Sequence, residues 1–105
     1  MKLASTVLLA ALLATRACTW VKLEQGGGAV RVAAADESMA RCTFKGDITT
    51  TVTNRLAGVE RNSIKVADEL ETLARNEAVG LGANTIQPKG PPVAGEQSFT
   101  AHSCP

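Results

Sequence analysis

One long helix is encoded by residues 62–79, NSIKVADELETLARNEAV, which carry apolar side chains at steps of three and four. That spacing places side chains on one face of an α-helix. The expected apolar stripe consists of Ile64, Ala67, Leu70, Ala74, Ala78 and Leu81. Asn62 or Ser63 can accept hydrogen bonds from the free N–H groups of the first turn. Two ion pairs are expected on the solvated side, Lys65 with Glu69 and Glu71 with Arg75.

Alternating apolar and polar residues on both sides of this helix predict β-strands. Before the helix they occupy residues 29–33 (AVRVA) and 44–53 (FKGDITTTVT), and residues 36–41 between them can form one helical turn. After the helix they occupy residues 83–87 (ANTIQ) and 97–103. In the second strand, the residues expected on one face are Phe44, Ile48, Thr50 and Val52. The order β, β, α, β, β predicts a small α+β domain in which one sheet packs against one long helix.

The N-terminus has the organisation of a secretory signal peptide. Lys2 follows the initiator Met, residues 3–14 (LASTVLLAALLA) form a 12-residue apolar stretch without a charge, and Ala17 ends the segment. A helix needs roughly 20 apolar residues to cross a bilayer, so this stretch is too short for a permanent span. We therefore expect residues 1–17 to be a signal peptide.

Cys18 stands at the expected cleavage site, where a lipoprotein carries its lipid. Ala17 and Cys18 fit a lipoprotein signal, whereas Thr15 and Arg16 stand where a Leu and a small or apolar residue are usual. Lipidation of Cys18 is our expectation, and ordinary signal-peptidase cleavage at the same point is the alternative. The residue after Cys18 is Thr19, whereas lipoproteins retained in the inner membrane commonly carry Asp at this position. In a Gram-negative bearer we expect a periplasm-facing outer-membrane lipoprotein, or a soluble periplasmic protein if Cys18 is unmodified.

The other two cysteines, Cys42 and Cys104, are expected to form a disulfide, since an exported chain enters an oxidising compartment. Lipidation of Cys18 accounts for the third. His102 lies two residues before Cys104, a spacing usable for a metal, but only Cys42 is available as a further ligand. A disulfide beside a surface histidine is therefore favoured over a metal site, and no cofactor is expected.

Three segments follow from these features: the signal peptide (1–17), a lipid-anchored tether (18–28) and a single α+β domain (29–105). The tether includes Gly26-Gly27-Gly28. A phosphate-binding loop needs a helix after its glycines, and here a predicted strand follows. We therefore expect a flexible linker at these glycines, and neither a repeat nor a second domain is visible.

Charge and aromatic content argue against nucleic-acid binding. Without residues 1–17 the chain keeps nine basic and ten acidic residues, a formal charge of about −1. Its aromatic residues are Trp20, Phe44 and Phe99. A nucleic-acid binder would carry a basic stripe with aromatic platforms for the bases.

Asn84 and Gly82 are the residues to which we assign a structural turn. They lie in GLGANT, where the helix passes into the next strand. The Asn84 amide at such a turn can bond the local backbone or adopt a left-handed conformation, and Gly80 and Gly82 are expected to end the helix. The sequence contains no assembled acid, base and nucleophile, so we expect neither an enzyme nor a small-molecule substrate.

Three segments resemble the YjeI-like small proteobacterial lipoproteins, a family of unknown function. They are ARNEAVGLGANTI (residues 74–86), CTFKG (42–46) and QSFTAHSCP (97–105). The chain is more distantly similar to the outer-membrane lipoprotein sensor of the Rcs envelope-stress phosphorelay. That sensor carries two disulfides, whereas this chain has cysteines for one. The resemblance implies a location in the cell envelope more directly than an activity.

Two classes of function remain. One is a membrane-anchored interaction or stress-sensing module whose edge strand or helix face contacts another envelope protein. The other is a structural or accessory lipoprotein without a dedicated signalling partner. A defined partner recovered by crosslinking in membranes would favour the first class, and a diffuse set of partners the second.

Overall fold

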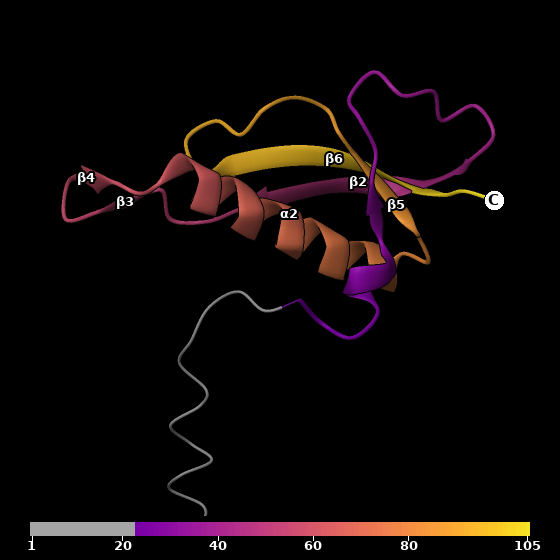
Figure 1. Ribbon diagram of the computed structural model, residues 1–105, viewed down its shortest axis with the longest axis horizontal. Helices are drawn as coiled ribbons and strands as arrows, with labels where there is room; N and C mark the ends of the chain where they lie inside the picture. The colour runs from indigo at the N-terminus through magenta and orange to yellow at the C-terminus, as the bar shows by residue number, and fades with distance from the viewer. Residues whose placement is uncertain (1–22) are drawn as a thin grey trace, which may run out of the picture.

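The computed structural model describes residues 23–105, which form a four-stranded main sheet with a single long helix on one face, and a small two-stranded sheet (Figure 1). In chain order the elements are η1 (Gly27–Ala29), β1 (Arg31–Val32), β2 (Thr43–Thr51), β3 (Arg55–Leu56), β4 (Val59–Glu60), α2 (Ser63–Gly80), β5 (Thr85–Pro88) and β6 (Glu96–Ser103). The predicted small α+β fold with one helix on one sheet is confirmed.

The main sheet has the strand order β1-β5-β6-β2. β1 runs parallel to β5, and the other neighbours are antiparallel. The β2–β6 ladder is the longest, with Thr51 opposite Glu96 at one end and Thr43 opposite Ser103 at the other. β1 and β2 are therefore the two edges, and they differ greatly in length because β1 spans only two of the five residues predicted to form it.

The core lies between α2 and the sheet. Four helix residues spaced by four are buried: Val66, Leu70, Ala74 and Ala78. Ala74 and Ala78 form one cluster with sheet residues that include Ile48, Ile86, Phe99 and Ala101. The predicted stripe was therefore partly wrong: Ile64 is 72% exposed, and Val66 takes its place in the core. Ile64 lies in the first turn of α2, and this turn lies beyond the end of the main sheet (Figure 1). Leu81, at the other end of the predicted stripe, is also exposed, because α2 ends before it.

α2 begins and ends much as its sequence predicts. The Asn62 side chain accepts hydrogen bonds from the N–H groups of Ile64 (2.9 Å) and Lys65 (3.3 Å). These contacts satisfy donors that have no partner inside the first turn. At the other end the helix stops at Gly80, and Gly82 has a positive φ of 71°.

A β-bulge in β2 overturns the predicted placement of Phe44. The register to β6 shifts between Phe44 and Gly46, so that an extra residue is inserted. Because side chains alternate along a strand, one inserted residue moves the preceding side chains to the opposite face. Ile48 and Thr50 are buried under α2 as predicted, whereas Phe44 is opposite His102 on the other face and is 57% exposed.

A second, two-stranded sheet is formed by β3 and β4, which project from the end of the molecule where α2 begins (Figure 1). Ala57 and Gly58 connect the strands, and both have positive φ, 52° and 79°. Two consecutive residues with positive φ are typical of a tight type I′ hairpin turn. The turn usually carries Asn or Asp before Gly, so Ala57-Gly58 is a weak signal, and this hairpin was not predicted.

The described part of the predicted tether is packed. Gly27 is buried and begins η1, which lies against α2. A Cβ at Gly27 would come within 2.7 Å of Asn76 Oδ1 and 2.8 Å of Leu23 Cδ1, so a larger residue here would displace these side chains. The flexible linker expected at Gly26–Gly28 is therefore wrong for this stretch. The rest of the tether and the whole signal peptide lie outside the described residues.

Residues 33–42 cross the sheet face opposite α2 as an irregular loop with two turns, and the predicted helical turn at 36–41 is absent. Gln87 on that face donates to the carbonyl oxygens of Ala34 (2.8 Å) and Glu37 (2.7 Å). Arg31 and Glu37 form an ion pair at 2.6 Å, and this hydrogen bond holds the pKa of the Glu37 carboxyl below its ordinary value. Within residues 23–105, no helix is long and apolar enough to span a bilayer.

Candidate functional site

The disulfide between Cys42 and Cys104 is present, with their Cα atoms 4.2 Å apart. It joins the residue before β2 to the residue after β6, at the C-terminal end of the chain. Cys18, the predicted lipidation site, lies outside the described residues.

Asn84 supports the same end of the molecule. Its Nδ2 donates to the Cys104 carbonyl oxygen at 2.8 Å, and its Oδ1 accepts from the Cys104 N–H at 2.8 Å. Thr85 Oγ1 also donates to Asn84 Oδ1, at 3.0 Å. The amide therefore satisfies the backbone of the C-terminal residues much as a neighbouring strand would. This geometry is that of a fold-bracing side chain.

His102 is buried, at 8% exposure, and so is not the surface histidine that was expected. Its Nε2 lies 2.9 Å from Thr100 Oγ1, and its ring meets that of Phe44 edge-on with centroids 5.8 Å apart. Phe44 covers it because the bulge places both residues on one face. Cys104 is held in the disulfide, and residues 23–105 contain no group of three His, Cys, Asp or Glu side chains placed to hold a metal ion.

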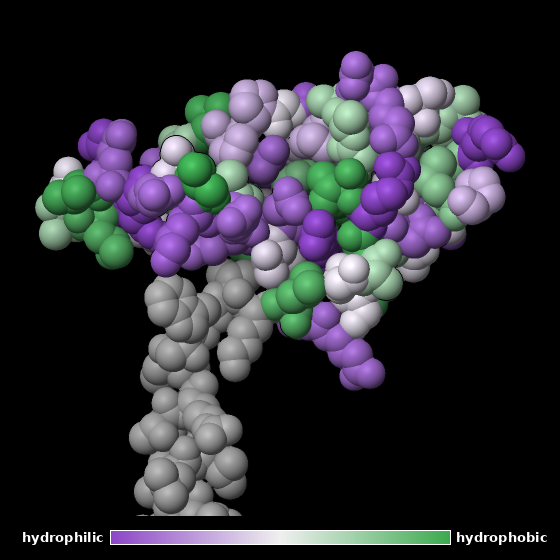
Figure 2. Space-filling view, in the orientation of Figure 1, coloured by the Kyte–Doolittle hydropathy of each residue, from purple (hydrophilic) through white to green (hydrophobic). Residues whose placement is uncertain are grey.

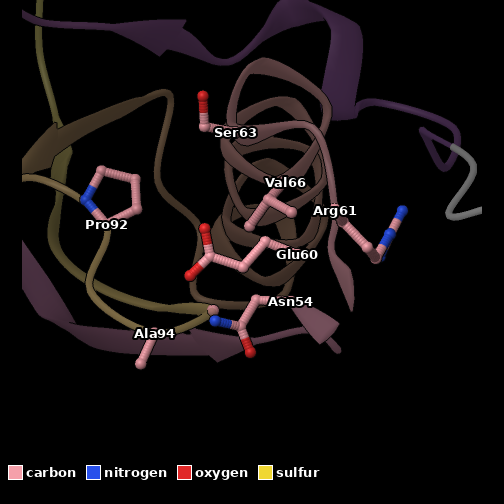
Figure 3. Close-up of a pocket in the computed structure, with 8 residues that line it drawn as sticks. Asn54, Glu60, Arg61, Ser63, Val66, Pro92 and Ala94 are labelled. Carbon is pink, nitrogen blue, oxygen red and sulfur yellow. The ribbon is translucent and has the colours of Figure 1, made fainter. Parts of the chain in front are cut away.

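A small pocket of about 160 Å³ lies at the opposite end, between the β3–β4 hairpin, the start of α2 and the β5–β6 connection (Figure 3). Its lining consists of Asn54, Glu60, Arg61, Ser63, Val66, Pro92, Ala94 and Gly95. Drug-sized ligands occupy pockets of roughly 300–1,000 Å³, so this pocket fits only a few waters or one side chain of a partner.

Arg61 points away from this pocket (Figure 3) and forms a half-buried ion pair with Glu69, with Nη2 and Oε1 2.6 Å apart. The hydrogen bond from Arg61 lowers the pKa of the Glu69 carboxyl, and the charge of Lys65 acts in the same direction. Glu69 was expected to pair with Lys65, and Arg61 forms a further ion pair with it that was not predicted. The predicted pair of Glu71 and Arg75 is present at 3.1 Å.

Apolar side chains surround the same pocket without being buried. Leu56 and Val59 on the hairpin, Ile64 on α2 and Val93 before β6 are each more than 60% exposed. In Figure 2 the hairpin carries one of the apolar patches of this view. We call these four residues the hairpin-end patch. Because they are exposed, this end of the molecule carries an uncovered apolar surface, and we refer to it as the open end.

Within residues 23–105, the outer edge of β2 is the longest strand edge of the main sheet without a neighbouring strand. The Val52 N–H donates to the Gly95 carbonyl at 2.8 Å, and the register is regular from Gly46 to Thr51. Main-chain groups in an antiparallel pair alternate between the two sides of a strand. Asp47, Thr49 and Thr51 therefore direct their N–H and C=O groups to the open edge.

A groove of about 410 Å³ lies beside this edge, on the side of α2. Its lining consists of Thr49, Thr50 and Thr51 from β2, Leu73, Asn76 and Glu77 from α2, and Glu24. The groove exists because Thr50 is fixed to the helix, its Oγ1 donating to the Leu70 carbonyl at 3.2 Å. The next helix residues toward solvent, Leu73 and Glu77, then extend beyond the edge of the sheet. The β2 edge thus offers main-chain donors and acceptors, and the adjacent helix residues offer side-chain contacts beside it.

Residues 21–104 match the family model of a domain of unknown function, DUF4156. This match covers well over half of the chain. The chain belongs to the DUF4156 family. No curated protein and no solved structure gives a significant match. The DUF4156 match includes β2, α2 and both ends of the sheet, so the open edge and its groove are part of the family's domain.

Sequence patterns alone do not identify the groove of this DUF4156 domain. They predict β2 as a strand, but they do not show which strand lies at an edge, because this depends on the order β1-β5-β6-β2. A signal for the groove wall was present in Leu73, Glu77 and Leu81, which follow each other at steps of four beside the buried stripe.

Proposed function

We propose that this protein is a membrane-anchored envelope lipoprotein whose DUF4156 domain binds an extended segment of another envelope protein. The open edge of β2 carries the proposal. A nine-residue edge strand is long enough to pair with a peptide, and the groove beside it offers side-chain contacts. Strand addition of this kind draws affinity from the main chain and specificity from neighbouring side chains. The proposal includes no catalytic residue, cofactor, nucleic acid or small-molecule substrate.

Edge strands that are not binding sites are usually short, covered or charged, because an open edge can pair with other chains. β1 follows this rule, since it spans two residues. β2 follows it only in part, since its bulge lies before Gly46 and the regular stretch to Thr51 has one charged side chain, Asp47. The difference between the two edges favours β2 as a surface meant for a partner.

The anchor in this proposal is acylated Cys18. The signal-like residues 1–17, the leftover cysteine and the resemblance to YjeI-like lipoproteins support it. One acyl chain binds a membrane only marginally, whereas a triacylated N-terminus is retained. Wild-type protein should incorporate labelled palmitate and fractionate with outer membranes, and Cys18→Ala should be released or stall in processing. Wild-type protein found wholly in the soluble fraction with an unmodified Cys18 would contradict the anchor but not the strand-binding site.

The binding site is tested by blocking one main-chain donor. Thr49→Pro removes an N–H at the open edge while leaving the ladder to β6 intact, since proline is tolerated on edge strands where the N–H faces solvent. Thr49→Val is the matched control, because it also loses the hydroxyl that lies 3.2 Å from Ser98 Oγ but keeps the N–H. A photo-crosslinking residue at Thr51 should capture a defined partner in membranes.

The expected result is a stoichiometric partner captured from Thr51 in wild type and Thr49→Val and lost in Thr49→Pro. A crosslinking residue at Arg31, on the short β1 edge, should capture no such partner. A diffuse set of products from both positions would contradict the proposal and favour an accessory role in the envelope, such as maintenance without a signalling partner.

A further inference from the structure

The helix side of the groove has a regular chemical pattern. Leu73 and Glu77 lie four residues apart on α2 and line the groove, and Leu81, the residue after the end of α2, continues the same line four residues later. Leu81 also reaches β2, where a Cβ at Gly46 would lie 3.4 Å from its Cδ1. This line of three side chains therefore follows the β2 edge between Thr50 and Gly46, and its side chains are in turn apolar, acidic and apolar.

The groove carries negative charge that the described part of the chain does not neutralise. Glu24 and Glu77 are exposed, and no cation within residues 23–105 forms an ion pair with either. Three nearby acidic residues are already paired: Asp47 with Lys89 at 2.7 Å, Glu69 with Arg61 and Glu71 with Arg75. Glu24 and Glu77, in contrast, both line the groove.

The spacing of the helix line matches that of a strand. Four residues of α-helix rise about 6 Å, and two residues of β-strand span about 6.8 Å. Alternate side chains of an added strand face one side of the sheet. Three successive side chains on that side would therefore meet Leu73, Glu77 and Leu81 in turn.

We propose that the β2 groove selects an extended segment in which one basic residue stands between two apolar residues, each two positions away. This inference rests on the proposed strand addition and names the chemistry of the partner. The basic side chain lies between Glu77 and Glu24, and the apolar side chains contact Leu73 and Leu81. Main-chain pairing is to Asp47, Thr49 and Thr51.

A second copy of this chain does not have that pattern. The residues of β2 that face the helix side are Gly46, Ile48 and Thr50, and none carries a positive charge. Pairing of two β2 edges about Thr49 would also bring the two grooves together, so that Glu24 and Glu77 of one copy would face those of the other. Repulsion between like charges opposes this arrangement, and charge complementarity favours a basic partner.

The test uses three labelled peptides that differ at one position, TVTKTVT, TVTQTVT and TVTETVT, and the purified full chain in neutral detergent. Fluorescence anisotropy gives the Kd of each. An exposed ion pair changes affinity by a small factor, so we expect the lysine peptide to bind about threefold tighter than the glutamine peptide and roughly tenfold tighter than the glutamate peptide at low salt. At 0.5 M salt the three values should converge.

Matched variants show which carboxylates cause the preference for the lysine peptide. Glu77→Gln and Glu24→Gln should reduce the lysine preference, and the double variant should abolish it. Glu71→Gln, which removes an acidic residue already paired on α2, should keep it. A lysine preference that survives in the double variant would overturn the assigned site.

The remaining outcomes separate this inference from the proposed function. Equal binding of all three peptides, lost in Thr49→Pro, would leave strand addition standing and overturn the charge selection. Absence of binding by the lysine peptide would contradict both. A dimer in sedimentation of the full chain that Thr49→Pro dissociates would show that a second copy occupies the edge, and would overturn the basic partner.

Discussion

The two ends of the sheet are held together by different means. At the end near the C-terminus, a disulfide and the Asn84 amide tie neighbouring segments together. At the other end, the β3–β4 hairpin and the start of α2 are joined by the Arg61–Glu69 ion pair, and four large apolar side chains remain exposed. The comparison shows a domain with one firmly crosslinked end and one open end, with the β2 edge running between them.

The largest effect is expected at the crosslinked end. Cys42→Ser or Cys104→Ser removes a bridge between residues 62 positions apart, and the entropy of the opened loop corresponds to about 4 kcal/mol of unfolding free energy. Urea unfolding with and without a reductant measures it. Equal urea midpoints for wild type and variant under non-reducing conditions would show that the disulfide does not stabilise its end of the domain.

The core between the ends is tested by Leu70→Ala, which should lower the unfolding free energy by about 3 kcal/mol because Leu70 is fully buried. Ile64→Ala, in the hairpin-end patch, is the control and should stay within about 0.5 kcal/mol. Equal losses from the two changes would contradict the face assigned to α2.

Asn84→Ala should cost about 1 to 2 kcal/mol, since it removes three hydrogen bonds, two of them exposed bonds to the backbone of Cys104. Hydrogen exchange should show faster exchange of the Cys104 amide in this variant. Asn54→Ala, at the open end, serves as the comparison and should leave that amide unchanged.

The ion pair at the open end should make a smaller, pH-dependent contribution. Hydrogen bonding to Arg61 lowers the pKa of Glu69 from its ordinary 4.5, so its stabilisation is present above pH 4.5 and is lost as the pH falls through the lower folded-state value. Glu69→Gln should cost at most about 1 kcal/mol at pH 7 and less at pH 3. A difference between wild type and variant that grows on acidification would contradict this assignment.

The smallest effect is expected in the hairpin-end patch itself. Leu56→Ser should change the unfolding free energy by less than about 0.5 kcal/mol, because the side chain is 64% exposed. Thermal unfolding of both proteins measures this. A loss comparable to that of Leu70→Ala would mean that the patch belongs to the core and that the end is not open.

Local patterns predicted the elements whose signals lie within one segment. Asn62 capped the helix as expected, and the alternation in β2 correctly placed Ile48 and Thr50 because both lie after the bulge. The cysteine pair followed from counting thiols in a chain that was expected to be exported. Each of these features depends on few residues that are close in sequence or chemically unique.

The missed features depend on pairing between distant segments. The bulge before Gly46 is visible only in the register to β6, so Phe44 was assigned to the wrong face. Ala57-Gly58 forms a hairpin turn without the usual Asn or Asp, which left β3 and β4 without a signal. The groove could not be predicted, because it requires knowing that β2 is an edge and that Leu73 stands beside it.

The unequal edges also limit how this domain can assemble. Growth of an open filament requires two adhesive surfaces on each subunit, whereas self-pairing through one surface closes after two copies. The four-stranded sheet has one long edge, β2, and its other edge, β1, spans two residues. A high local concentration can therefore drive these sheets to pair at most, and fibril growth by edge-to-edge stacking stops there.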